Sequence, residues 1–324
     1  MTTSLLTLAA DFEERESRHL PDVVVPMHDL AMAHDGSVVV PGLGNTVMTK
    51  WASTQLAHMF GYRERWFETV LPTERPVEIT KRFRASGRNV RLRLGREQGQ
   101  DRPLLRAFVS RSYSPVLDST VCVALHHALG SVGDLPVVRS YVTDMSTTWV
   151  VQVGERFKLG GPGQVGEVFG TLTIRNSDVG FASLLVAASL LRIACLNGPV
   201  LPVGDAVLFA RRHRGLRPGE LPQALADKLY GIGDRIHRGA RVLESAGEIA
   251  IADVAHEVRQ ALKAANIPMR LAAHVLRAYQ YEPHPSRYGI AESLTLAAQW
   301  VTPEEGLSLQ QAASRYLMSA GAVS

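Results

Sequence analysis

Two stretches of the chain are rich in arginine, the side chain best suited to grip phosphate. Residues 81–111 hold ten basic side chains against only Glu97 and Asp101, which leaves a net charge of +8. Residues 211–241 hold eight basic side chains against three acidic ones, which leaves +5. Arginine greatly outnumbers lysine in both stretches, and its planar guanidinium binds phosphate with two hydrogen bonds and stacks on bases. These residue types predict the binding of a polyanion.

The charge of the whole chain hides this asymmetry. All 324 residues carry a net charge of +4, so the residues outside the two stretches carry −9. The alternative is that the stretches are two solvated basic faces without a partner. The residues that we expect to bind nucleic acid are Lys81, Arg82, Arg84, Arg88, Arg91, Arg93, Arg175, Arg211, Arg212 and Arg214.

Motifs for catalysis or cofactor binding are weak in this sequence. Residues 161–166 match G-x-G-x-x-G, but the residues that follow alternate like a strand, whereas the dinucleotide motif needs a helix there. We therefore interpret the glycines as a hairpin turn. His256-Glu257 lacks a second histidine four residues later and is not a zinc-protease helix. We expect no catalytic residue, no cofactor and no metal.

The composition predicts an ordinary globular protein with a buried core. The chain is 46% hydrophobic and 20% charged, with a mean hydropathy of +0.01, which excludes disordered and fibrous classes. Its longest uncharged apolar run, Val179 to Leu191, falls short of the ~20 residues that span a membrane. The first residues lack the basic start of a secretory signal. Cys122 and Cys195 form no disulfide framework, and we expect a cytoplasmic location.

The first third of the chain alternates between short elements. We predict a helix over 5–16, an extended stretch over 21–26, a strand over 37–40 and a helix over 49–59. Strands at 77–83 and 90–94 and a return strand at 104–109 complete a hairpin. Arg91 and Arg93 alternate with apolar residues in the middle strand, so one strand face would be arginine. Such a face needs a counter-charge, from nucleic acid or an acidic protein surface.

The rest of the chain predicts one further sheet segment and then helices. Ser114-Pro115 opens a helix, residues 137–153 and 165–175 read as strands, and 182–196 reads as a long apolar helix. From residue 218 the chain is helical, with a clear helix start at Thr302-Pro303. The fold class is α+β: a curved, mainly antiparallel sheet backed by helices, followed by an all-helical C-terminal region. We divide the chain into an N-terminal extension (1–30), a core domain (31–215) and the helical region (216–324).

Two short motifs resemble a phage- and plasmid-associated family, domain of unknown function 932. The first runs from Arg175 to Gly180 and has the form R-N-S-x-x-G; the second, Leu191 to Gly198, ends R-x-x-C-x-N-G. Residues 289–295 resemble the C-terminal helix of that family, whereas Pro199 departs from its pattern. The resemblance implies a mobile-element context and supplies no catalytic residue. Asn176 and Ser177 are also explained as turn and cap residues, with ligand contact by Arg175, Asn176 or Arg192 as the alternative.

These observations lead to one expected function and two alternatives. We expect a non-enzymatic, largely sequence-independent nucleic-acid-binding protein, homo-oligomeric, that favours single-stranded DNA and acts in recombination, replication or single-strand annealing. One alternative is an assembly factor whose arginines pair with an acidic partner or a neighbouring subunit. The other is an enzyme whose site forms only in three dimensions, for example as a pocket with two carboxylates.

Overall fold

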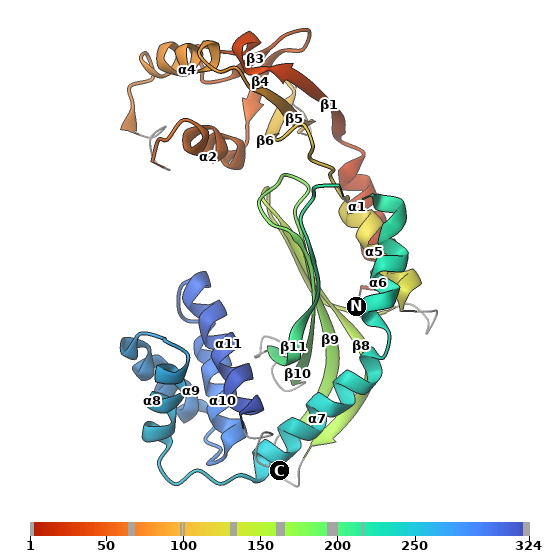
Figure 1. Ribbon diagram of the computed structural model, residues 1–324, viewed down its shortest axis with the longest axis vertical. Coiled ribbons are helices and arrows are strands. Elements are labelled where there is room, and N and C mark those ends of the chain that lie inside the picture. The colour runs from red at the N-terminus through yellow and green to blue at the C-terminus, as the bar shows by residue number, and fades with distance from the viewer. Residues whose placement is uncertain are drawn as a thin grey trace.

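The computed structural model describes residues 3–63, 69–97, 99, 101–129, 135–159, 166–192, 200–215 and 217–319. These residues form a six-stranded sheet, a five-stranded sheet and a helical C-terminal region (Figure 1). The predicted α+β class with a helical C-terminus is confirmed. The strands divide into two sheets, where the sequence suggested one.

The first sheet forms an N-terminal lobe, at the top of Figure 1. Its strand order is β1–β5–β6–β4–β3–β2, antiparallel except for the parallel pair β4–β6. The strands are β1 (His19–Pro26), β2 (Ala31–Met32), β3 (Val38–Val40), β4 (Gly44–Met48), β5 (Asn89–Gly95) and β6 (Leu104–Val109). The predicted hairpin of β5 and β6 is confirmed. Leu92 and Leu94 of β5 enter the lobe core.

Two helices complete this lobe, and one of them corrects our prediction. Helix α2 (Lys50–Met59) confirms the helix predicted over 49–59, and the Thr49 side chain caps its start. Residues 77–83, predicted as a strand, lie in helix α4 (Arg75–Arg84). Ile79 and Phe83, four residues apart, are fully buried, whereas Val77 is 68% exposed. The helical period therefore prevails over the short apparent alternation, and Pro76 in the first turn favours the helix.

The second sheet is an antiparallel meander in the order β11–β10–β9–β8–β7. Its strands are β7 (Val137–Val142), β8 (Thr147–Leu159), β9 (Gly166–Asn176), β10 (Leu184–Arg192) and β11 (Val200–Arg211). Four helices cover one face, on the right in Figure 1: α1 (Leu5–Glu16), α5 (Asp118–Ala128), α6 (Leu221–Leu229) and α7 (Ile232–Glu248). Trp149 of β8 packs edge-on against Phe12 of α1, with ring centroids 5.5 Å apart.

Residues 182–196, predicted as a helix, hold the interior strand β10 in their described part. β10 pairs with β9 on one side and β11 on the other. A strand buried in the middle of a sheet and a buried helix both produce a continuous apolar run, so hydropathy alone does not separate them. Residues 193–199, with the second family-like motif and its Asn-Gly ending, lie outside the described residues.

The helical C-terminal region forms as predicted. It contains α8 (Val254–Ala264), α9 (Ala272–Tyr281), α10 (Arg287–Ala297) and α11 (Pro303–Met318). Thr302 and Glu305 form a capping box at the start of α11. Helices α10 and α11 pack against β11, so this region is joined to the second sheet.

Residues 3–30, the described part of the predicted N-terminal extension, contact both sheets rather than standing apart from them. Helix α1 packs on α5 and the second sheet, and β1 pairs with β5 in the first. Helix α5 begins at Asp118, three residues later than Pro115. The intervening chain is held extended, because Ser114 donates its N–H to the carbonyl of His213 at 2.9 Å.

Candidate nucleic-acid interface

The arginine face of β5 is occupied by carboxylates of the same chain. Arg93, whose side chain is 6% exposed, donates from Nη1 to Asp22 at 2.7 Å and from Nη2 to Asp178 at 2.9 Å. Arg91 is half-buried and lies 3.8 Å from Asp22. The counter-charge that this strand requires is therefore supplied within the protein, and Arg93 presents almost no surface to an external ligand.

Asp178 is the centre of this ion-pair network. Arg106 of β6 binds both of its carboxylate oxygens, at 2.6 and 3.0 Å, and His19 Nε2 lies 3.9 Å away. Burial by itself would raise the pKa of Asp178, but Arg106 and then Arg93 hold this pKa well below its usual range. Asp178 follows β9 of the second sheet, whereas Arg93 and Arg106 belong to the first. The network therefore joins the two sheets.

The loop around Asp178, which contains the first family-like motif, is held by further bonds from the first lobe. Trp51 Nε1 and Gln55 Nε2 of α2 both donate to the carbonyl of Val179, at 3.1 and 3.3 Å. Gly180 has a φ of +79°, a conformation that favours glycine. These contacts make residues 176–180 a structural joint.

The two polar residues of the motif act as turn residues. Asn176 donates from Nδ2 to Asp118 at 2.7 Å, and the hydroxyl of Ser177 donates to the carbonyl of Met145 at 2.7 Å. Both side chains are buried. This supports the turn interpretation over ligand contact for Asn176, while Arg175 is exposed at the end of β9.

A second group of predicted residues lies on α4 and just after it. Lys81, Arg82, Arg84 and Arg88 are exposed. Arg82 donates from Nε to Glu78 at 2.8 Å. Basic residues in the last turn of a helix stabilise its carbonyl end, so this group has a structural role even without a ligand. In Figure 1, α4 lies at the outer end of the first lobe, far from the end of the second sheet.

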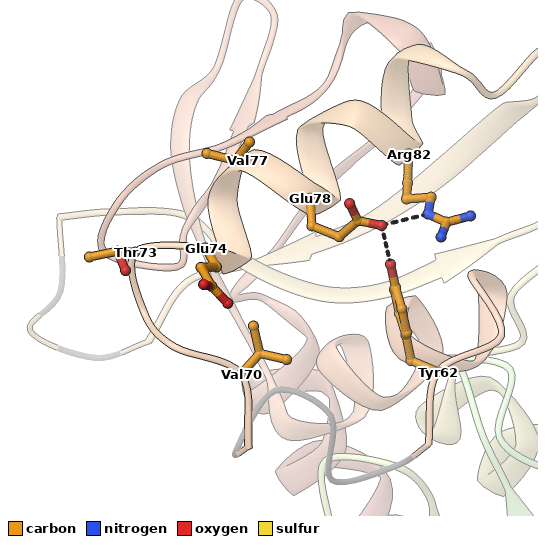
Figure 2. A pocket seen from close by; sticks show the side chains of 7 residues that line it. All are labelled: Tyr62, Val70, Thr73, Glu74, Val77, Glu78 and Arg82. Atoms are coloured by element: carbon orange, nitrogen blue, oxygen red, sulfur yellow. Dashed lines mark hydrogen bonds and ion pairs between the residues drawn. The ribbon is translucent and has the colours of Figure 1, made fainter.

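A hollow of about 570 Å³ beside α4 brings two carboxylates together. Figure 2 shows Glu78 between the Tyr62 hydroxyl and Arg82, with Glu74 one turn earlier on the same wall. The hydrogen bonds from Tyr62, at 2.6 Å, and then from Arg82 lower the pKa of Glu78. Glu78 is thus ionised at neutral pH, the wrong state for a general acid. Residues 64–68, which connect Tyr62 towards Val70, lie outside the described residues.

A third group lies where β11 ends, next to the junction of the two lobes. Arg211, Arg212 and Arg214 are all exposed. Residues 110–114 run alongside this end of β11. Tyr113 and Arg214 form an isolated antiparallel β-bridge, and Nε of Arg214 donates to Ser112 Oγ at 3.2 Å. Arg212 and Arg214 line a hollow of about 340 Å³. Neither forms an ion pair within the described residues.

Arg175 lies on the face of the second sheet that is turned away from α1, α5, α6 and α7. Residues opposite each other on neighbouring strands share a face. By this register one row across all five strands contains Tyr141, Thr148, Arg175, Leu185 and Ala210. The neighbouring row contains Arg139, Val150, Thr173, Ala187 and Val207. We call these two rows the open face.

The open face is exposed at four of its ten residues, five others are half-buried, and Val150 is buried. Tyr141 is 59% and Val207 53% exposed, and Arg175 and Ala210 are also exposed. Across the described residues, no carboxylate forms an ion pair with Arg139 or Arg175. The open face therefore combines an aromatic ring and arginines with small and hydroxyl side chains.

The structure thus divides the ten predicted residues among separate places. Arg175, Arg212 and Arg214 lie on or beside the open face, the α4 group lies at the other end of the first lobe, and Arg93 is internal. Arg211 shares a face with the buried Leu184, opposite to that of Arg175. Sequence analysis missed Arg139 and Tyr141, whose alternation in β7 was the available signal.

Further findings concern metal ligands, membrane-spanning helices and similar proteins. In the part of the chain that the structure describes, no three histidine, cysteine, aspartate or glutamate side chains are grouped to hold a metal ion. None of the described helices combines the length and apolar character needed to cross a membrane. No family model, curated protein or solved structure matches this chain.

Proposed function

We propose that this protein binds single-stranded nucleic acid, single-stranded DNA in particular, along the open face of its second sheet. The observation that carries the proposal is the cross-strand row in which the exposed Tyr141 and Arg175 lie on the same face of the sheet. Proteins that bind single strands combine positive charge for the backbone with aromatic rings on which bases stack.

The dimensions of the open face suit a single strand. Its rows cross five strands, so at ~4.8 Å between strands they extend over about 19 Å. Tyr141 and Arg175 are two strands apart, or about 10 Å. Thr148, Thr173 and Ala187 between and beside them are small, which leaves a shallow surface for an extended chain.

The side chains of the open face favour binding without base specificity. Arginine binds phosphates, which carry no sequence information, and stacking on tyrosine accepts every base. The family-like motifs support a role in recombination, replication or single-strand annealing in a phage or plasmid, by a cytoplasmic homo-oligomer. The annealing role is proposed by analogy between this arrangement of hairpins, helices and an arginine-bearing sheet face and the arrangement of proteins that bind single strands.

Binding can be measured by fluorescence anisotropy with labelled oligothymidylate in a series of salt concentrations. Tyr141→Ala should weaken binding about 5- to 160-fold, because stacking contributes ~1–3 kcal/mol per base. Arg175→Ala should weaken binding and reduce the salt slope by about 0.7, the contribution of one phosphate contact. Arg84→Ala, which removes an exposed arginine of α4, is the matched control and should change neither quantity.

Two results would contradict the proposal. One is the absence of oligonucleotide binding at low salt, where phosphate contacts are strongest. The other is an equal loss of affinity in Arg84→Ala and Arg175→Ala, which would indicate a general charge effect rather than a binding face.

The exposed apolar side chains favour a protein partner, in particular a neighbouring subunit, as the second candidate. Val207 is 53% and Val142 46% exposed, and both lie on edge strands of the second sheet. Such side chains are typical of protein interfaces. Light scattering after size exclusion separates the candidates: self-association that oligonucleotide does not alter supports the second, and a new oligonucleotide-dependent species supports the first.

A further inference from the structure

The hollow at the lobe junction, defined above by Arg212 and Arg214, is a candidate ligand site of its own. Its remaining lining consists of Ser110, Tyr113, residues 180–183 and His213. We propose that this hollow binds one nucleotide, with the phosphate at Arg212 and Arg214 and the base against Phe181. The inference deepens the proposed function, because that nucleotide would be one unit of the strand on the open face.

The phosphate half of the site rests on two exposed guanidinium groups. Arg214 donates from Nε to Ser112 Oγ at 3.2 Å, which orients its guanidinium. Arg212 is two residues away, and its carbonyl accepts the N–H of Arg214 at 2.7 Å, so the chain turns tightly between them. Paired guanidinium groups without an acidic partner in the described residues are the donors that a phosphate group requires.

The base half of the site rests on Phe181. Its ring is 46% exposed, although it packs edge-on against Trp51 with centroids 5.1 Å apart. This contact fixes an exposed flat ring at the wall of the hollow, and stacking on such a ring tolerates any base. A Cβ at the neighbouring Gly180 would lie 3.2 Å from Val109, so glycine also allows residue 180 to pack closely on Val109.

His213 gives an independent indication of a ligand. It is 4% exposed and lines the hollow; the backbone of Ser114 lies close enough to affect its protonation, yet neither ring nitrogen makes a hydrogen bond of normal geometry. Burial lowers the pKa of His213 to about 4, so at neutral pH the ring is uncharged, with one donor and one acceptor. Buried polar atoms are nearly always satisfied. The ring therefore marks the polar wall of the hollow, against which a nucleotide would lie.

The size and position of the hollow agree with a nucleotide. Its volume of about 340 Å³ lies in the range of small-molecule sites, ~300–1,000 Å³. Ser183 and Arg212 lie two residues beyond Leu185 and Ala210 of the open face. A single-stranded nucleic acid bound along the open face can therefore continue into the hollow.

The test uses the full chain, with thymidine monophosphate, inorganic phosphate and oligothymidylate as three separate probes in calorimetry. Arg214→Ala and Phe181→Ala should each weaken thymidine monophosphate binding at least ten-fold. Phe181→Ala should leave phosphate binding unchanged, since phosphate does not stack. Arg217→Ala is the matched control, because Arg217 is exposed, pairs with Glu220 and lies outside the hollow.

The outcomes separate this inference from the proposed function. Failure to bind thymidine monophosphate at millimolar concentration overturns the nucleotide site; oligothymidylate binding that Arg214→Ala does not change overturns it too and leaves the open face standing. Nucleotide binding without oligonucleotide binding supports the site and overturns the proposed function. Phe181→Leu, which keeps an apolar side chain without a flat ring, should also lose nucleotide binding while its unfolding transition stays close to that of the native chain.

Discussion

The guanidinium of Arg93 donates hydrogen bonds to both the carboxylate and the backbone carbonyl of Asp178. Nη2 of Arg93 lies 2.9 Å from Oδ2 of Asp178, and Nε donates to the carbonyl oxygen of the same residue at 3.0 Å. The two residues are 85 positions apart: Arg93 lies in β5 of the first sheet, and Asp178 lies in the loop after β9 of the second. An arginine that the sequence suggested for nucleic-acid binding therefore connects the two halves of the fold.

Arg93→Ala should lower the free energy of unfolding by about 3 kcal/mol, because it leaves the largely buried carboxylates of Asp22 and Asp178, 15% and 14% exposed, with fewer partners. Chemical denaturation of the variant and of Arg84→Ala tests this. The exposed Arg84 should change stability by no more than about 0.5 kcal/mol. Equal, small effects of both substitutions would show that the Arg93 contacts do not stabilise the joint.

The contribution of His19 and His213 to stability should fall as the pH decreases from 6.5 towards 4, whereas Glu16 and Asp118, whose pKa values are raised by burial, act in the opposite direction. Burial, and for His19 also the charge of Arg106, lowers the pKa values of His19 and His213 from 6.5 to about 4. The unfolded chain therefore binds more protons in this window, and each histidine contributes a slope of up to ~1.4 kcal/mol per pH unit. Thermal unfolding against pH measures the slope.

His213→Phe separates the two histidines. The substitution removes one titrating group and two unsatisfied ring nitrogens, so it should reduce the slope between pH 6.5 and 4 by about half. At neutral pH the variant should be at least as stable as the native chain. An unchanged slope would show that His213 keeps an ordinary pKa in the folded protein.

Gly170→Ala should destabilise the second sheet by about 1–3 kcal/mol, the usual effect of overpacking. A Cβ at this position would lie 2.5 Å from Ile236 Cδ1 of α7 and 2.7 Å from the carbonyl oxygen of Val153. The Ile236 side chain can partly move aside, but the backbone of Val153 in β8 cannot do so easily, so β8 and β9 must separate locally. Gly36→Ala is unsuitable as a control, since its φ is +81°; Gly87→Ala, with open space and an ordinary φ, should be nearly neutral. Comparable melting temperatures of the Gly87 and Gly170 variants would contradict the packing of α7 on β9.

The basic groups should contribute unequally to the salt dependence of nucleic-acid binding. Replacing Arg175, Arg212 and Arg214 together by alanine should reduce the salt slope by about 2, or ~0.7 for each lost phosphate contact. Replacing Lys81, Arg82 and Arg84 together should leave the slope unchanged, because α4 lies at the far end of the first lobe. Anisotropy titrations over a salt series compare the two triple variants. A larger effect of the α4 variant would move the binding surface to that helix.

Local sequence signals predicted most elements correctly. The cap at Thr49, the capping box at Thr302 and the alternation of Val90, Leu92 and Leu94 depend on residues a few positions apart. Two elements were assigned the wrong type. In α4 a short apolar pattern fits both the strand period of 2 and the helix period of 3.6, and in β10 a continuous apolar run fits either a buried strand or a buried helix. For β10 the deciding factor is its hydrogen bonding to β9 and β11, which no window of neighbouring residues contains.

The sequence by itself determined the α+β class, the helical C-terminal region and the excess of arginine in two stretches. Only the tertiary structure decided which arginines face solvent. Alternation assigns Arg91 and Arg93 to one side of a strand, but whether that side meets water or carboxylates depends on chain 71 and 85 positions away from Arg93, where Asp22 and Asp178 lie. Charge composition is a property of residues, whereas a binding surface is a property of how distant segments cover one another.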